Sequence, residues 1–384
     1  MRVLILGARA PACLEWARAF SEAGWSVCVG DSLSQPISRF SRAVQHFVRL
    51  PEPRQNPTTW IEALEKTIET HRIDLLIPTC EEVFYLGQGL ERLTPLCRLL
   101  ISNFSLLQRL HHKAYFAAMT HGWTLTAPET RLLTDRLALS DLQSESALWV
   151  FKPAYSRFAS RTLIRPASHQ LNDVQPTDAT PWVAQKFVEG VEFCSFSILI
   201  KGVLRAHSCY QPRYRVGRGS GIYFQPNSPE PVRRFLEQFG RETGYTGQVG
   251  FDFIQDGDGC FHVLECNPRA TSGVHLFDNQ RRALVNSLSD ASACVLEPTQ
   301  EPRMIALAML LLAGPRRTLS IPFWRDYAAA RDVIGHKGDV APFAAQILSF
   351  AEIIARAASR RCGLLAASTS DIEWNGPQSV DQSQ

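Results

Sequence analysis

The first hundred residues alternate short apolar runs with segments of helical spacing. Pro11–Ala23 repeats apolar residues at a helical interval and stops at Gly24, and the more polar segment Thr58–Thr70 is also expected to be a helix. Strands that alternate with helices predict a parallel sheet whose ligand-facing residues lie at the strand ends. The apolar runs expected to form its strands are Val3–Leu6, Ser26–Gly30, Asp74–Pro78 and Leu99–Ser102.

The regular alternation of strands and helices ends at about residue 105. A helix carrying His111, His112 and Lys113 precedes several strand patterns, a helix over Pro231–Thr243, and a hairpin over Gly250–Asn267. From about residue 291 the chain looks mainly helical, with its clearest amphipathic piece at 341–357. We therefore expect units at 1–105, 106–180, 181–290 and 291–384.

Composition excludes several classes of function. A net charge of +3 is too small to indicate nucleic acid, and the ten cysteines form no C-x-x-C motif or Cys/His cluster that would bind zinc. The apolar run at the N-terminus is too short for a signal peptide, and the ten-residue stretch Met304–Ala313 is too short to span a bilayer. We expect a soluble cytoplasmic protein without a nucleic-acid or membrane partner.

The turn after the first strand argues against a dinucleotide. It reads Gly7-Ala8-Arg9-Ala10-Pro11, which lacks the G-x-G-x-x-G fingerprint, and the proline removes an amide that could hold a phosphate. After the strand Asp74–Pro78, Glu81 stands where a carboxylate could face a substrate crevice. An acid-rich helix N-terminus explains Glu81 equally well.

The hairpin carries the most specific chemistry. If its turn is centred between Asp258 and Gly259, Asp252 lies directly opposite Glu265, and Asn267 lies on the same face. A slip of one residue would put the two carboxylates on opposite faces.

Two carboxylates and an amide oxygen on one face form a hard oxygen site, which suits Mg²⁺ shared with phosphate oxygens. The apolar neighbours of Glu265 indicate burial, which is costly for a carboxylate without a cation. Arg269, just beyond the strand, can pair with a phosphoryl group. The alternative is a polar edge strand that faces solvent.

The segment Glu265–Arg269 resembles the Glu-x-Asn-Pro-Arg signature of the ATP-grasp superfamily, and partial matches follow in the family's order over roughly residues 1–290. The resemblance implies an α/β fold: an N-terminal Rossmann-like pre-ATP-grasp domain, a two-lobed α+β ATP-grasp domain and a mainly helical C-terminal extension. It also implies ATP and two Mg²⁺ ions as cofactors, with Asp252, Glu265 and Asn267 as the metal ligands.

The same resemblance implies where the nucleotide binds. Lys113 and Lys152 match the two nucleotide-binding lysines of the family. The segment that follows resembles the hinge between the two lobes, where backbone groups meet the adenine edge and a carboxylate holds the ribose hydroxyls. The contacts implied for this hinge come from Gln185, Lys186, Phe187, Val188 and Glu192.

Two loops near the expected phosphates are basic. The loop 153–161 lacks the glycines of the family, so Ser156 and Arg157 are expected to replace backbone amides, unless the loop binds the acceptor or is impaired. The glycine-containing loop Arg213–Gly221 could close over triphosphate or an anionic substrate through Arg215 and Arg218, or could be a solvated turn. We assign catalytic roles to Arg269, Lys152 and Arg215.

The resemblance implies an ADP-forming ligase that joins a carboxylate to an amine through an acyl phosphate, with small molecules as substrates. Ser272 and His275 join Glu81 as candidate substrate contacts, and the segment 371–376 either folds back onto the site or caps the last domain. Phosphorylation of another acceptor and a nucleotide-binding module without catalysis are the alternatives. Formation of a homodimer is left open.

Overall fold

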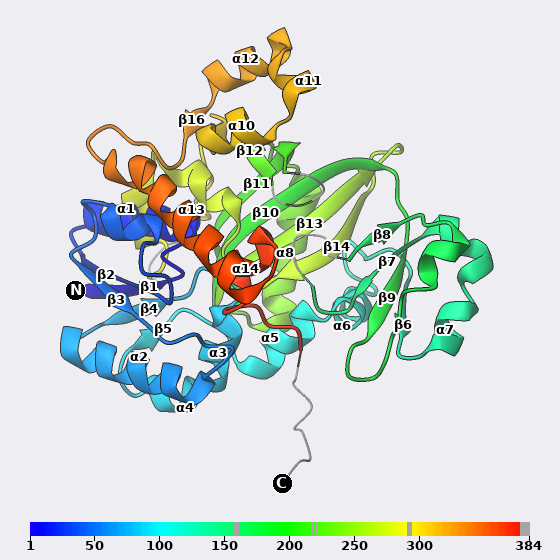
Figure 1. Cartoon of the computed structure of the whole chain (residues 1–384), viewed down its shortest axis with the longest axis horizontal. Coiled ribbons are helices and arrows are strands. Elements are labelled where there is room, and N and C mark those ends of the chain that lie inside the picture. Colours follow the sequence, from blue (N-terminus) through cyan, green and yellow to red (C-terminus); the bar gives the residue numbers. More distant parts are fainter. Residues whose placement is uncertain (157–160, 217–218, 220, 290–293, 377–384) are drawn as a thin grey trace.

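The computed structural model describes residues 1–156, 161–216, 219, 221–289 and 294–376. An α/β domain at the N-terminus and a small lobe lie at opposite ends of the molecule, with a larger sheet between them (Figure 1). The C-terminal helices lie across the N-terminal domain and above the larger sheet. The expected combination of one parallel sheet with antiparallel sheets is confirmed.

The N-terminal domain is built on a parallel sheet in the order β3-β2-β1-β4-β5. Gly7 adopts φ 77° between the first strand and the first helix, and a Cβ there would lie 2.6 Å from the Thr79 hydroxyl. Strand β3 was not expected from the sequence, because only two of its four residues are apolar. The elements are β1 (Arg2–Leu6), α1 (Pro11–Glu22), β2 (Ser26–Asp31), β3 (His46–Arg49), α2 (Pro57–His71), β4 (Leu75–Ile77), α3 (Glu82–Gln88), α4 (Leu90–Leu93) and β5 (Arg98–Leu99).

The helix expected around Lys113 is two helices, α5 (Phe104–His111) and α6 (Lys113–Met119). His112 leaves helical geometry at φ −74° and ψ 110°, and its Nδ1 accepts the Tyr115 amide hydrogen at 3.3 Å. The break makes Lys113 the first residue of a new helix, where its amide donates to the Ala154 carbonyl at 3.1 Å. It thereby fixes Lys113 beside the end of strand β7.

The small lobe contains an antiparallel sheet in the order β6-β9-β7-β8 around the buried Trp149, Phe151 and Trp182. Strand β9 lies beyond the expected boundary at residue 180, yet it pairs inside this sheet. The elements are β6 (Thr130–Leu133), α7 (Arg136–Ser140), β7 (Trp149–Pro153), β8 (Leu163–Ile164) and β9 (Trp182–Lys186).

The larger sheet has the order β14-β13-β10-β11-β12-β15-β16. Helix α8 packs on one face, where Phe235 and Phe239 meet the ring of Phe251. The 3-10 helix η4 (Ser272–Phe277) lies on the other, against Phe196. The elements are β10 (Gly190–Ile200), β11 (Val203–Arg215), β12 (Gly221–Pro226), α8 (Glu230–Thr243), β13 (Gly247–Asp256), β14 (Phe261–Asn267), α9 (Arg281–Asn286), β15 (Arg303–Met304) and β16 (Arg331–Asp332).

The C-terminal part is mainly helical, as expected: α10 (Ala306–Leu312), α11 (Pro315–Thr318), α12 (Ile321–Ala329), α13 (Ala341–Arg360) and α14 (Leu364–Thr369). Helix α13 is, within the described residues, the one helix long and apolar enough to cross a membrane by length and composition alone. It runs in front of the N-terminal domain (Figure 1). After α14 the chain returns to the carboxyl edge of the parallel sheet, where Trp374 is buried.

Candidate active site

A cleft of about 1080 Å³, measured with its open mouth, lies between the small lobe and the larger sheet. Its walls come from β7, β8 and β9 on one side and from β10, β11, β13 and β14 on the other. Eleven residues expected at the nucleotide and metal sites line it: Lys113, Lys152, Ser156, Gln185, Lys186, Phe187, Val188, Glu192, Arg215, Asp252 and Glu265.

Two lysines converge on one carboxylate inside the cleft. Lys113 Nζ lies 3.6 Å and Lys152 Nζ 3.8 Å from Glu265 Oε2. Lys113 also donates to the Ser156 carbonyl at 3.0 Å, and Lys152 donates to the Gln185 amide oxygen at 3.1 Å. These contacts hold both ammonium groups at the floor of the cleft, where a polyphosphate could meet them.

The metal-ligand candidates lie together on the hairpin β13–β14. Asp252 pairs with Glu265 and Gly250 pairs with Asn267, which confirms the expected register. The turn itself is centred on Asp258, half a residue before the expected position between Asp258 and Gly259. A β-bulge opposite the Asp252–Phe253 step shifts the register by one residue, so that Asp252 still pairs with Glu265. Asn267 Nδ2 donates to Asp252 Oδ2 at 3.2 Å.

Burial and charge act differently on the two carboxylates. Burial and the neighbouring charge of Glu265 raise the pKa of Asp252 to about 7. Burial opposes ionisation of Glu265 as well, but the charges of Lys113 and Lys152 outweigh it and lower the pKa of Glu265 to about 2. Burial also lowers the pKa of Lys152 to about 8.

This oxygen set fits a magnesium ion that is shared with phosphate. A divalent cation would offset the repulsion between the two carboxylates that raises the Asp252 pKa. Among the described residues no group of three or more His, Cys, Asp or Glu could hold a metal. Magnesium usually keeps several waters and is bound through one or two carboxylates plus substrate phosphates. Arg269 donates to the amide oxygen of Asn267, the third candidate ligand, at 3.1 Å.

The hinge side of the cleft combines polar backbone with apolar walls. Arg165 lies over the Phe187 ring at 5.1 Å, and Lys186 lies over Trp149 at 4.9 Å. Arg215 forms an ion pair with Glu192, the residue implied to hold the ribose. Most of the apolar wall could not be predicted from the sequence, because alternation alone does not show which strand face meets a ligand. These residues are Val150, Ile164, Phe193, Phe253, Ile254 and Leu264.

Some predicted residues are not described by the structure, and others are described but do not line the cleft. Arg157 and Arg218 fall outside the described residues. His275 does not reach the cleft: it is buried on η4, 3.5 Å from the Glu15 carboxylate of α1. Ser272 is half-buried beside the Tyr210 hydroxyl, and Tyr210 itself neighbours Asp252.

The segment 371–376 was expected either to fold back onto the site or to cap the last domain; it packs against the N-terminal domain, beside the cleft but without lining it. Trp374 stacks on Phe84 at 4.7 Å and contacts His111 and Tyr155 at 5.9 and 5.1 Å, next to Lys113 and Ser156. Its amide donates to the Glu81 carboxylate at 3.1 Å, so Glu81 is covered by the C-terminal segment.

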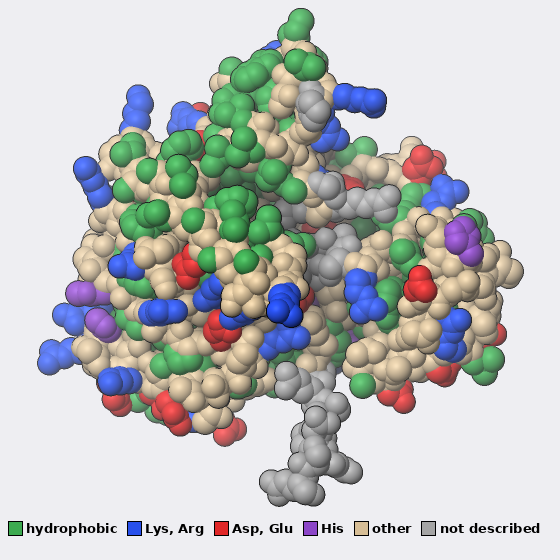
Figure 2. All heavy atoms as spheres, in the orientation of Figure 1, with side chains coloured by type: hydrophobic (Ala, Val, Ile, Leu, Met, Phe, Trp, Pro, Cys, Tyr) green, Lys and Arg blue, Asp and Glu red, His purple; other side chains and the backbone are tan. Residues whose placement is uncertain are grey.

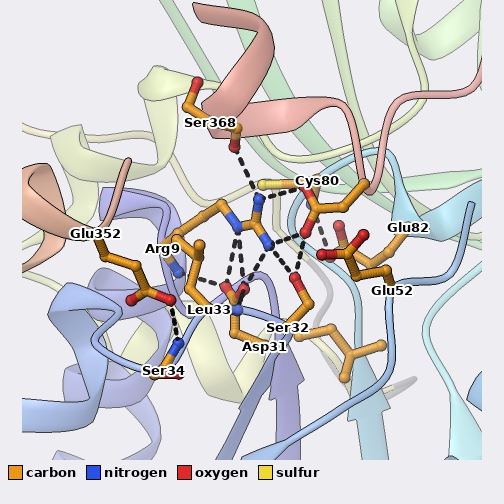
Figure 3. Close-up of polar contacts among 12 residues, drawn as sticks. Arg9, Asp31, Ser32, Leu33, Ser34, Glu52, Cys80, Glu82, Glu352 and Ser368 are labelled. Carbon is orange, nitrogen blue, oxygen red and sulfur yellow. Dashed lines mark hydrogen bonds and ion pairs between the residues drawn. The ribbon is translucent and has the colours of Figure 1, made fainter. Parts of the chain in front are cut away.

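Arg9 fastens this segment and was not identified as a site residue from the sequence. Its guanidinium binds Asp31 and Ser32 at the end of β2 (Figure 3) and both oxygens of Asp371, at 2.6 to 2.7 Å. The one available signal was a basic residue in the first turn with an acid at the end of the next strand. Its partner Asp371 is too distant in sequence to be inferred.

Comparisons with known proteins identify the fold. No family model matches the chain, and no curated protein matches it. Among solved structures it is similar to N5-carboxyaminoimidazole synthetase from Staphylococcus aureus, with a TM-score of 0.63 and 11% identity over 81% of this chain and 84% of that chain.

Two other solved structures are similar. L-amino acid ligase from Bacillus licheniformis has a TM-score of 0.57 and 15% identity over 75% of this chain and 74% of that chain. Phosphoribosylamine–glycine ligase from Thermotoga maritima has a TM-score of 0.60 and 14% identity over 79% and 78%. The chain and these proteins share one architecture at low sequence identity.

Proposed function

We infer that this chain, which has the ATP-grasp fold, is an ATP- and magnesium-dependent ligase that joins a carboxylate to an amine. The observation that carries the inference is the meeting of Lys113, Lys152 and Glu265 in the cleft, with Asp252 and Asn267 beside them. Such a set provides cations for a polyphosphate and oxygen ligands for a divalent metal within one cavity.

The residues of the cleft divide the work between binding and charge neutralisation. Lys113 and Lys152 would neutralise nucleotide phosphates, while Gln185 holds the Lys152 ammonium in place. Asp252, Glu265 and Asn267 would hold magnesium, which supplies positive charge to the transferring phosphoryl group. Catalysis would rest on positioning and electrostatics, without a covalent enzyme intermediate.

The proposed chemistry has two steps. A substrate carboxylate oxygen attacks the γ-phosphorus of ATP, and ADP leaves, which yields an acyl phosphate. An amine then attacks the acyl carbon, an amide bond forms, and inorganic phosphate leaves with the electron pair of the broken C–O bond. The proton that the amine nitrogen loses goes to the departing phosphate or to water. The names of the three similar structures, a synthetase and two ligases, support this reaction class. Ser272 and Arg269, beside the metal ligands, are the proposed acceptor contacts.

A hydroxylamine trap tests the proposal. The protein would be incubated with Mg-ATP, a panel of small carboxylates including amino acids, and hydroxylamine as the amine. Because hydroxylamine captures acyl phosphates, we expect carboxylate-dependent ADP release together with a hydroxamate. Glu265→Gln should reduce both signals at least about a hundredfold, since it removes a charged metal ligand.

The matched control is Asp258→Asn, which neutralises an exposed carboxylate in the turn of the same hairpin. We expect this variant to keep full activity. ADP release without hydroxamate would instead indicate phosphorylation of another acceptor. Unchanged turnover in Glu265→Gln would exclude the proposed site.

A further inference from the structure

Helix α13 presents its apolar side to solvent. Ile347 is 73% exposed, and Leu348, Phe350 and Ile354 are each about half exposed. Hydrophobic side chains gather around α13 and up toward α10–α12 on this side of the molecule (Figure 2). We define the α13 face by its exposed apolar residues Val340, Phe343, Ile347, Leu348, Phe350 and Ile354, and the α10–α12 edge by Leu311, Leu312, Leu319, Ile321 and Trp324.

The polar side of α13 is bound to the N-terminal domain. Glu352 accepts the amide hydrogens of Ser34 and Gln35 at 2.8 and 2.7 Å. Arg356 donates to the Ser32 carbonyl at 3.0 Å and lies 3.4 Å from the Asp371 carboxylate. These contacts fix the orientation of the helix, so the apolar side cannot turn inward without breaking them.

Between Arg303 and Ser370, the exposed charges that lack a partner of opposite sign among the described residues are all basic. Every acidic residue between Arg303 and Ser370 is engaged within the protein: Asp326 with Arg213 and Tyr214, Asp332 with backbone amides, Asp339 with Arg18, and Glu352 as above. In contrast, four basic side chains of the same stretch are exposed and have no acidic partner among the described residues: Arg316, Arg325, Lys337 and Arg361.

We propose that the α13 face and the α10–α12 edge bind the surface of an anionic lipid bilayer. A helix with one apolar side, flanked by unpaired basic residues, lies in the interfacial plane with its apolar side in the headgroup region. The basic residues would contact acidic headgroups and add electrostatic attraction near the membrane surface. The helix would lie on the bilayer without crossing it, because Glu352 and Arg356 hold its other side.

A second copy of this chain fits the same surface less well. In a two-fold symmetric dimer the same patch is used by both subunits. The basic residues around the two patches would then approach one another without acidic partners, which is unfavourable for a stable interface. The proposal concerns a surface outside the cleft and does not depend on the ligase reaction.

Vesicle flotation tests the proposal with the full chain. We expect it to float with vesicles of phosphatidylcholine and phosphatidylglycerol, to stay in the bottom fraction with phosphatidylcholine alone, and to be released by high salt. The double variant Ile347→Ser, Phe350→Ser should lower the vesicle affinity about tenfold or more, because it removes two apolar anchors. Lys337→Glu combined with Arg361→Glu should weaken binding to the anionic vesicles similarly.

Leu137→Ser is the matched control, since Leu137 is also 73% exposed but lies on α7 in the distant small lobe. It should bind vesicles like the unmodified chain, and all variants should keep the same circular dichroism spectrum. Absence of flotation with anionic vesicles would overturn the proposal. So would a dimer in sedimentation experiments that the Ile347/Phe350 variant converts to monomer while no vesicles are bound.

Discussion

Two glutamates are kept ionised by different partners. Glu265 faces the cleft and depends on two lysines that a nucleotide would also contact. Glu15 is almost fully buried on α1 and binds the Arg281 guanidinium of α9 at 2.7 Å. Burial disfavours its ionised form, but the charge of Arg281 outweighs that effect and lowers the pKa of Glu15 to about 2. The first carboxylate serves the site, whereas the second joins two helices.

Glu15→Gln should therefore change stability in a pH-dependent way. The pKa of Glu15 is depressed in the folded protein, so its contribution is complete above the ordinary value of 4.5 and is lost as the pH falls toward about 2. At neutral pH we expect the variant to lose roughly 3 kcal/mol of unfolding free energy, measured by urea denaturation. The difference from the unmodified chain should shrink at about pH 3. An equal difference at both pH values would contradict this role.

The hairpin β13–β14 depends on Gly250, at the end that carries the candidate metal ligands. A Cβ on Gly250 would lie 2.3 Å from Thr271 Cγ2 and 2.6 Å from the Ser195 carbonyl oxygen. The Ser195 backbone belongs to β10, the neighbouring strand. The close approach of these strands is thus what brings Asn267, the partner of Gly250, into line with Asp252.

Gly250→Ala should push these strands apart. We expect a loss of about 2 kcal/mol or more in unfolding free energy, as for an overpacked core, together with weaker binding of Mg-ADP in calorimetry. Gly257→Ala, in the exposed turn of the same hairpin, is the control, because a Cβ there meets nothing within 4 Å. Equal effects of the two substitutions would show that the contact at Gly250 is unimportant.

Local sequence patterns predicted where helices and strands occur better than they predicted which side of each element contacts the rest of the protein. The two hairpin carboxylates could be placed together because they are 13 positions apart in one hairpin and side chains alternate between the faces of a strand with a period of two. The helical period of α13 was visible too, but a period does not show which side meets the protein. His275 was assigned to the substrate because it follows Asn267 closely, yet η4 carries it beneath the sheet toward Glu15.

The C-terminal segment is joined to the N-terminal domain at the carboxyl edge of the parallel sheet. Asp371 binds Arg9, and Trp374 packs between Phe84 of the N-terminal domain and His111, next to the break between α5 and α6. Arg9 near the N-terminus and Asp371 in the C-terminal segment are thus joined on the side of the molecule that adjoins the cleft. No local pattern could have shown this, because Arg9 and Asp371 are 362 positions apart.

Trp374→Ala should weaken nucleotide binding, although Trp374 does not line the cleft. Its ring supports His111 and Tyr155, which adjoin Lys113 and Ser156. We expect the dissociation constant for Mg-ADP, measured by calorimetry, to rise about tenfold, the effect of a shift in one positioned charge. Trp324→Ala, an exposed tryptophan on α12, should leave it unchanged. Equal affinities of the two variants for Mg-ADP would show that the C-terminal segment does not support nucleotide binding.

The contact between Arg9 and Asp371 can form only late in synthesis, because the two residues are 362 positions apart. Arg9 is synthesised first, then Lys113 and Lys152, and then Asp252 and Glu265. The segment that supports His111 and Tyr155 follows only after about 100 further residues. On the ribosome, Arg9 can pair with Asp31 but has no second acid. A polypeptide released before Asp371 would contain every proposed ligand for ATP and magnesium and would still lack the support behind Lys113. Nucleotide affinity would therefore report whether translation had reached that point.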